Sequence, residues 1–119
     1  MAPHLSTALE HNGDVKIEVL SDILRVPVAE LAESIGVDVL DIDCEPTARS
    51  PGANKRLAML VELLRMTAPW AGSVEMAWAH YRSYPIPALG SLTAEALLVR
   101  GRSEELSEYL RHIEDGGYA

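Results

Sequence analysis

The chain has 119 residues, a net charge of −8 and no Phe, with 48% apolar and 24% charged residues. This length and composition predict one compact domain, or two small helical subdomains that share a core, built from Leu, Val, Ile, Ala and Met with two Trp. Its single cysteine, Cys44, excludes an internal disulfide and a cysteine-based metal site. No apolar run approaches the ~20 residues that a membrane span needs, and the first residues lack the pattern of a signal peptide. We therefore expect a cytoplasmic protein without membrane spans.

The charged residues are distributed unevenly along the chain. Residues 1–46 hold ten acidic and two basic side chains, residues 47–90 hold two and five, and residues 91–119 hold six and three. An acidic N-terminal part repels polyanions such as nucleic acid and suits a basic protein surface. A face that only keeps the protein soluble explains the same acidity equally well.

Three short helices are predicted in the first part of the chain. Residues 1–14 show no periodicity and are expected to be flexible. From Val15 onward, apolar residues at helical spacing predict a first helix, and VAELAESIG predicts a second that stops at Gly36. A third, short helix is expected over residues 38–43, followed by the breaker-rich loop CEPTARSPGAN.

A long helix and three shorter ones are predicted in the rest of the chain. Ser50 and Pro51 form a start signal for the long helix, which the segment APWAGS is expected to break. Ser73, Thr93 and Ser103 are expected to cap VEMAWAHYRS, AEALLVR and EELSEYLRHIED. The segment YPIPALGSL between the first two is expected to form a rigid turn, because prolines fix φ. No strand is predicted, so the expected fold is all-α with about seven helices.

The segment AESIGVDVLDIDCE has the spacing of a helix-turn-helix. Ala32 provides a small residue where two helices approach, and Gly36 permits the turn. An ordinary helical hairpin explains this spacing as well. Reading DNA requires basic or amide side chains at base edges and phosphates, but residues 28–46 contain six acids and no Lys or Arg. We therefore expect a degenerate helix-turn-helix that is kept for packing, with DNA binding weakened or lost.

Other kinds of site find little support in the sequence. The residues that could make weak contacts with a DNA backbone are Arg49, Lys55 and Arg56. The four histidines do not pair at the spacing of a metal site. No phosphate-binding loop, nucleophile elbow or supported carboxylate pair is present. We expect no enzymatic activity, no metal and no cofactor.

The C-terminal half carries apolar and aromatic residues in segments that would usually be polar. A turn with two prolines is one such segment, and GGYA with Tyr118 is the other. Tyr118 is hard to explain as part of a core. It would serve either as a folded-back lid or as an insert for the pocket of a partner.

In these segments the chain resembles the antitoxins that have an Xre/MbcA/ParS-like toxin-binding domain. The matching segments are APWAGS, YRSYPIPALGSLTAEALL, the GR pair at 101–102 and YLRHIEDGGYA. With the helix-turn-helix frame and the helix at 53–67, the resemblance covers roughly residues 16–119. It implies an Xre-like helix-turn-helix region at 15–67 packed on a C-terminal toxin-binding domain at 68–119.

The resemblance implies a type II antitoxin that neutralises a RES-domain toxin by occluding its NAD pocket. Such toxins degrade NAD⁺ or use it to ADP-ribosylate a target. Family members commonly form a homodimer within a toxin–antitoxin hetero-oligomer. Carried onto this chain, the toxin-binding residues are Trp78, Tyr81, Pro85, Pro87, Leu89, Gly90, Arg111, Glu114, Asp115, Gly117, Tyr118 and Ala119.

The expected mechanism is steric and electrostatic. Glu114, Asp115 and a terminal carboxylate would occupy a positively charged NAD site while Tyr118 fills an apolar recess. The chain departs from the family pattern at Ser91, where many members have a second glycine, and in its acidic reading helix. Two alternative functions stay open: a DNA-binding autorepressor of its own operon, and a helical adaptor for another protein.

Overall fold

The computed structural model describes residues 15–42 and 49–114. Within them the chain is mostly helical, which confirms the predicted all-α class with about seven helices. The expectation of a flexible segment at 1–14 lies outside the described residues. The helices are α1 (Ile17–Leu24), α2 (Val28–Ile35), α3 (Val39–Ile42), α4 (Pro51–Ala71), α5 (Val74–Ser83), α6 (Ala94–Val99) and α7 (Ser103–Glu114).

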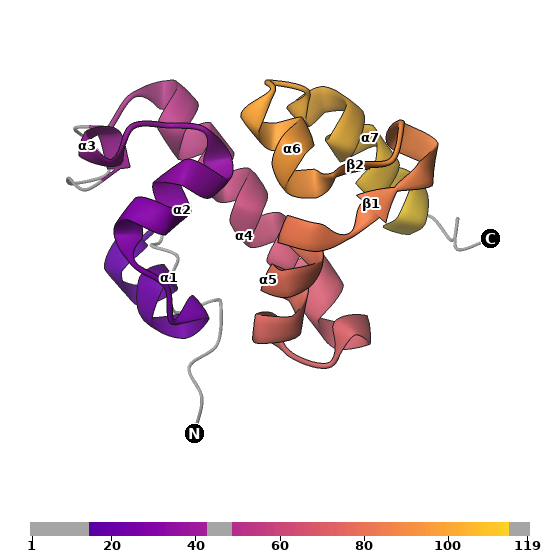
Figure 1. Cartoon of the computed structure of the whole chain (residues 1–119), viewed down its shortest axis with the longest axis horizontal. Helices are drawn as coiled ribbons and strands as arrows, with labels where there is room; N and C mark the ends of the chain where they lie inside the picture. Colours follow the sequence, from indigo (N-terminus) through magenta and orange to yellow (C-terminus); the bar gives the residue numbers. More distant parts are fainter. Residues whose placement is uncertain (1–14, 43–48, 115–119) are drawn as a thin grey trace.

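The long helix α4 runs through the middle of the molecule (Figure 1). Helices α1 to α3 lie on one side of it, and α6, α7 and a small hairpin lie on the other (Figure 1). The side chain of Ser50 caps α4 by accepting a hydrogen bond from the Ala53 N–H at 3.1 Å, as the sequence predicts. The helix continues through Pro69 and its last residue is Ala71, inside the APWAGS segment that was expected to break it. Proline has no N–H to donate within a helix, and α4 ends two residues after Pro69.

Strands were not predicted, but a two-stranded antiparallel hairpin forms within the YPIPALGSL turn. Strands β1 (Pro85–Ile86) and β2 (Leu92–Thr93) pair in the register Pro85↔Thr93 and Ile86↔Leu92. The 3₁₀ turn η3 (Pro87–Leu89) joins them. Two-residue strands have no alternation that a sequence pattern can reveal, so the prolines predict the turn and not the pairing.

One hydrophobic core joins both halves of the chain. Its fully buried members come from all seven described α-helices, α1 to α7. The largest of these side chains are Leu20, Leu31, Ile35, Ile42, Leu57, Leu60, Leu64, Leu97, Leu98 and Leu106. Because the buried face of α4 contributes to this single core, the N-terminal helices and the C-terminal helices are held around a common axis.

Candidate functional site

The segment that was predicted to form a helix-turn-helix contains the short helix α3 among its described residues. Within the described residues α3 is a single turn of four residues. The carboxylate of Asp38 accepts a hydrogen bond from the Leu40 N–H at 2.9 Å, which caps this turn. The carboxylate of Asp41 accepts from the hydroxyl of Ser50 at 2.8 Å and thereby ties α3 to the start of α4. Leu40 is 80% exposed. This segment therefore carries acidic side chains and one exposed leucine at positions where a DNA-reading helix carries basic side chains.

Two of the three basic residues considered for DNA contacts serve the fold instead. Arg49 is only 6% exposed, and its guanidinium donates to the carbonyl of Val15 at 2.8 Å. Arg56 donates to the carbonyls of Ile35 and Gly36 at 2.8 and 3.2 Å. These carbonyls lie at the end of α2, where a positive charge is favourable. Arg49 is therefore not presented to a phosphate on the surface, Arg56 is partly buried, and Lys55 is exposed.

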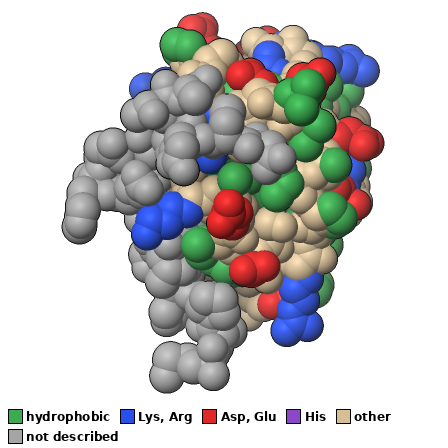
Figure 2. All heavy atoms as spheres, turned by 90° about the vertical axis from the view of Figure 1, so that its left-hand side faces the viewer, with side chains coloured by type: hydrophobic (Ala, Val, Ile, Leu, Met, Phe, Trp, Pro, Cys, Tyr) green, Lys and Arg blue, Asp and Glu red, His purple; other side chains and the backbone are tan. Residues whose placement is uncertain are grey.

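Figure 2 shows the face formed by the N-terminal helices. On the part of it that described residues form, acidic side chains lie among apolar and basic ones and do not make one block (Figure 2). On this visible part of the face, the described acidic side chains are therefore interspersed with side chains of other types.

Trp78 and Tyr81, expected among the toxin-binding residues, are buried in the protein's own core. Trp78 is 8% exposed and Tyr81 is 3% exposed. The hydroxyl of Tyr81 donates to the carbonyl of Ser34 at 2.6 Å, and burial raises the pKa of this phenol well above its ordinary value. The two rings stack with centroids 5.7 Å apart. Trp78 therefore supports a surface rather than forming one, whereas Tyr81, although buried, contributes to the wall of an apolar pocket.

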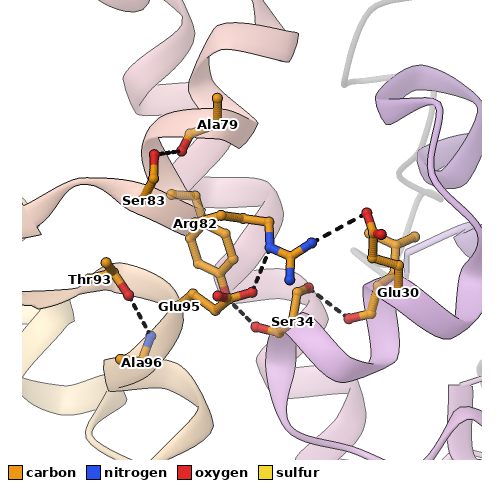
Figure 3. A network of polar contacts seen from close by, with 10 residues as sticks. Glu30, Ser34, Ala79, Arg82, Ser83, Thr93, Glu95 and Ala96 are labelled. Carbon is orange, nitrogen blue, oxygen red and sulfur yellow. Dashed lines mark hydrogen bonds and ion pairs between the residues drawn. The ribbon is translucent and has the colours of Figure 1, made fainter.

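Arg82 links three helices beside this buried pair (Figure 3). From α5 its guanidinium contacts Glu95 of α6 at 2.8 Å and Glu30 of α2 at 3.3 Å. The same guanidinium lies 5.4 Å from the ring centroid of Trp78, within the range of a cation–π contact. The network joins the N-terminal helices to the C-terminal ones on the surface of the core (Figure 3).

The proline turn is exposed and held rigidly. Pro85 and Pro87 are exposed, and Leu89 is partly buried. The Ser91 N–H donates to the carbonyl of Ile86 at 2.9 Å, which closes the turn. Gly90 has a φ of 73° and Ser91 a φ of 61°. This left-handed conformation favours glycine, so the backbone at Ser91 would accept the glycine found in many members of the resembled family.

An apolar pocket of about 340 Å³ opens between the proline turn and α7. Its aromatic rings are preorganised. The His80 ring stacks on Tyr84 with centroids 4.3 Å apart, and Trp70 meets His80 edge-on at 4.9 Å. Trp70 is 57% exposed and Tyr84 is 47% exposed. The described lining residues are Leu63, Thr67, Trp70, His80, Tyr81, Tyr84, Ile86, Ala94, Leu106, Tyr109 and Leu110.

The end of α7 lies beside the proline turn, as Figure 1 shows. Ile86 of β1 and Leu110 of α7 line the same pocket, although they are far apart in the sequence. Arg111 is exposed near the end of α7, and Glu114 is the last residue of that helix. The other predicted tail residues lie outside the described residues: Asp115, Gly117, Tyr118 and Ala119.

Sequence reasoning missed Trp70, Tyr84 and Tyr109 as candidate site residues. Trp70 follows a proline, and Tyr84 precedes one, so both lie where a helix ends. An aromatic residue at a helix end is a usable signal, because such positions seldom face a core. Tyr109 gave no signal, because its helical spacing fits a buried face as well.

Three further observations concern membrane spans, metal binding and the protonation of His80. No described helix is long and apolar enough to cross a membrane. No three described His, Cys, Asp or Glu side chains are grouped so that they could hold a metal ion. Burial lowers the pKa of His80 below its ordinary value of 6.5.

Comparisons of the chain with protein-family models, with curated proteins and with solved structures find no match. The resemblance to the Xre/MbcA/ParS-like antitoxins therefore stays a prediction from the quoted sequence segments. The proline turn, the aromatic pocket and the exposed end of α7 are the features on which a function can be argued.

Proposed function

We propose that this chain is a type II antitoxin that binds and neutralises a RES-domain, NAD-consuming toxin through its C-terminal region. The observation that carries the proposal is the convergence of the proline turn and the last turns of α7 at one apolar pocket. These two segments hold six of the twelve residues that the family resemblance assigns to toxin binding. They lie on the side of α4 away from α1 to α3 (Figure 1).

The exposed residues at this end of the molecule suit a protein interface. Trp and Tyr are enriched among the residues that dominate binding energies, and Trp70 and Tyr84 are both about half exposed. The proline turn is already closed by a hydrogen bond, so docking it costs little conformational entropy. A partner that covers the turn would also cover the pocket rim.

The acidic residues that follow Leu110 add an electrostatic component. A pocket that holds the pyrophosphate of NAD must be positively charged, and Glu114 and Asp115 are complementary to it. In this proposal the tail enters the toxin's NAD site and Tyr118 fills an apolar recess there. The complex is a hetero-oligomer built on an antitoxin homodimer in the cytoplasm, where NAD⁺ is available to the toxin.

The autorepressor alternative is less well supported. Arg49 and Arg56 are engaged with backbone carbonyls, and the segment at residues 28–46 carries six acids without a base. Counterion release would then contribute little to DNA binding. The helix-turn-helix frame is better explained as a packing element and a dimerisation surface.

The proposal is tested by co-expression with the neighbouring gene's product, where that gene encodes a RES-domain protein. Growth and cellular NAD⁺ are followed with the toxin alone and with this chain present, and any complex is purified. We expect this chain to restore growth and NAD⁺ and to form a stable complex. Persistent toxicity in the presence of abundant folded chain would contradict the proposal.

Two matched variants locate the interface. Ala88 is exposed on η3 in the proline turn, and Ala29 is exposed on α2. We expect Ala88→Arg to weaken the complex at least tenfold, because an arginine must be accommodated at a close contact, and Ala29→Arg to leave it within about twofold. Deletion of residues 115–119 is expected to abolish protection of NAD⁺. Full protection by the deleted chain would exclude the tail as the blocking element.

A further inference from the structure

The pocket between α4, α5, β1, α6 and α7 has the size of a small-molecule site. Its volume of about 340 Å³ lies within the roughly 300–1,000 Å³ of ligand pockets. Five separate elements form its walls, so its shape depends on tertiary packing and not on one flexible loop. Leu106 at its base is fully buried, and Trp70 at its rim is 57% exposed. The pocket therefore has a floor fixed in the core and a mouth open to solvent.

The rings around this pocket are oriented before any ligand arrives. Tyr81 is held by its hydrogen bond to the Ser34 carbonyl at 2.6 Å. Tyr84 is held by the stacked ring of His80, with an angle of 15° between the planes. Trp70 stands at 90° to His80. A flat ring that enters the mouth would meet ring faces and ring edges, the geometry in which aromatic pairs attract.

The lining is also electrically neutral. The described residues that form it include no Asp, Glu, Lys or Arg. The polar side chains of the lining are those of Thr67, His80, Tyr81, Tyr84 and Tyr109, of which the Tyr81 hydroxyl already donates to the Ser34 carbonyl. Burial disfavours the charged form of His80, so the imidazole is neutral near pH 7. A charged ligand would lose its hydration without gaining a partner charge, whereas an uncharged ligand with one N–H or O–H group would not.

We propose that this pocket is a binding site for an uncharged, planar aromatic small molecule. The neutral lining selects against ions, the oriented rings select for a flat aromatic ligand, and the hydroxyls and imidazole accept its polar hydrogen. This site does not depend on the toxin-binding proposal, because it requires only the described core and rim.

The test uses the full chain and indole as the probe, with indole-3-acetate and tryptamine as its anionic and cationic analogues. Binding is followed by changes in the backbone amide spectrum and by calorimetry. For a ligand of this size we expect a Kd on the order of 0.1–1 mM. The charged analogues are expected to bind about tenfold more weakly or worse. Amide shifts should concentrate on the elements that line the pocket.

Two equally exposed residues provide a matched pair of variants. Trp70 and Met76 are each 57% exposed, but only Trp70 lines the pocket. We expect Trp70→Ala to weaken indole binding at least tenfold and Met76→Ala to leave it within about twofold. Because both side chains are exposed, neither change is expected to alter the fold, which circular dichroism checks.

Four outcomes would overturn the proposal. No amide shift at millimolar indole excludes the site, and equal binding of the charged analogues excludes its selectivity for neutral ligands. Indole binding that appears only in the Tyr118→Ala variant would assign the pocket to the chain's own C-terminal segment. Self-association that Trp70→Ala removes and indole does not affect would assign this face to a second copy of the chain.

Discussion

The N-terminal helices and the C-terminal helices use their side chains in opposite ways. Around α1 to α3 the charged groups are directed at the fold itself: Arg49 and Arg56 hold backbone carbonyls, and Asp41 holds the start of α4. At the other end of the molecule two aromatic side chains, Trp70 at the end of α4 and Tyr84 after α5, are left about half exposed. The comparison teaches that charged side chains can serve the fold at one end of a small helical protein while aromatic side chains stay exposed at the other.

The largest expected effect tests the contact between these two regions. Gly36 has a φ of 76°, and a Cβ added there would lie 2.8 Å from the Arg56 guanidinium and 3.1 Å from the Val99 Cα. Gly90 has a similar φ of 73°, but its added Cβ would meet nothing within 4 Å. We expect Gly36→Ala to lower the free energy of unfolding by about 3 kcal/mol and Gly90→Ala by about 1 kcal/mol, measured by chemical denaturation.

The difference between the two glycine variants isolates the packing contribution, because both positions share the strain of the left-handed conformation. Equal destabilisation by Gly36→Ala and Gly90→Ala would mean that the end of α2 does not pack tightly against Val99 of α6.

The next effect tests whether the basic residues near the helix-turn-helix frame are structural. Arg49→Met is expected to cost about 2 kcal/mol of folding stability, because a buried carbonyl of Val15 loses its charged donor. Lys55→Met, on the exposed face of α4, is expected to change stability by less than about 0.5 kcal/mol. Thermal and urea unfolding measure both. A greater loss in Lys55→Met would contradict the structural assignment of Arg49.

A smaller effect is expected at the network that joins the two regions. Arg82→Gln removes the contacts with Glu30 and Glu95 and should cost about 1 kcal/mol, since all three side chains are partly exposed. Arg65→Gln removes an ion pair with Glu62 within α4 and should cost about 0.3 kcal/mol. The Arg82 effect should shrink in 1 M salt. If the loss of stability in Arg82→Gln does not change with salt, it arises from the packing of Arg82 on Trp78.

The smallest effect is a pH dependence that arises at the pocket. Burial lowers the pKa of His80 in the folded state below 6.5. The His80 imidazole therefore takes up its proton at a higher pH in the unfolded chain than in the folded one. Stability should therefore fall as the pH drops below 6.5 and through the lower folded value. His80→Gln is expected to flatten this part of the profile, and His112→Gln, at an exposed position on α7, provides the control. A profile unchanged by His80→Gln would contradict the burial of this imidazole.

Much of the local structure was predictable because its signals are local. Ser50, Ser73 and Thr93 each cap the helix that the sequence predicts, with hydrogen bonds of 3.0–3.1 Å to a backbone N–H. Gly36 ends α2 where it was expected. The exposure of Pro85 and Pro87 also agrees with the predicted turn. In each case the stabilising partner lies within a few residues along the chain.

The candidate site was less predictable because its residues meet across long sequence separations. Helical spacing placed Trp78 and Tyr81 along one side of a helix, but could not show that Ser34 and Arg82 would enclose them. Spacing likewise could not show that Trp70, Tyr84 and Tyr109 would surround one pocket. The burial of Arg49 depends on the carbonyl of Val15, a residue 34 positions away.

The sequence by itself determined the all-α class, the helix caps, the proline turn and the overall acidity. Periodicity, capping residues and proline stereochemistry act within a few residues, so they can be read without knowing how the helices pack. Only the tertiary structure decided which arginines are buried, which aromatic rings remain exposed and where an apolar pocket opens. These properties depend on which distant segments exclude water from a side chain, and packing alone sets that.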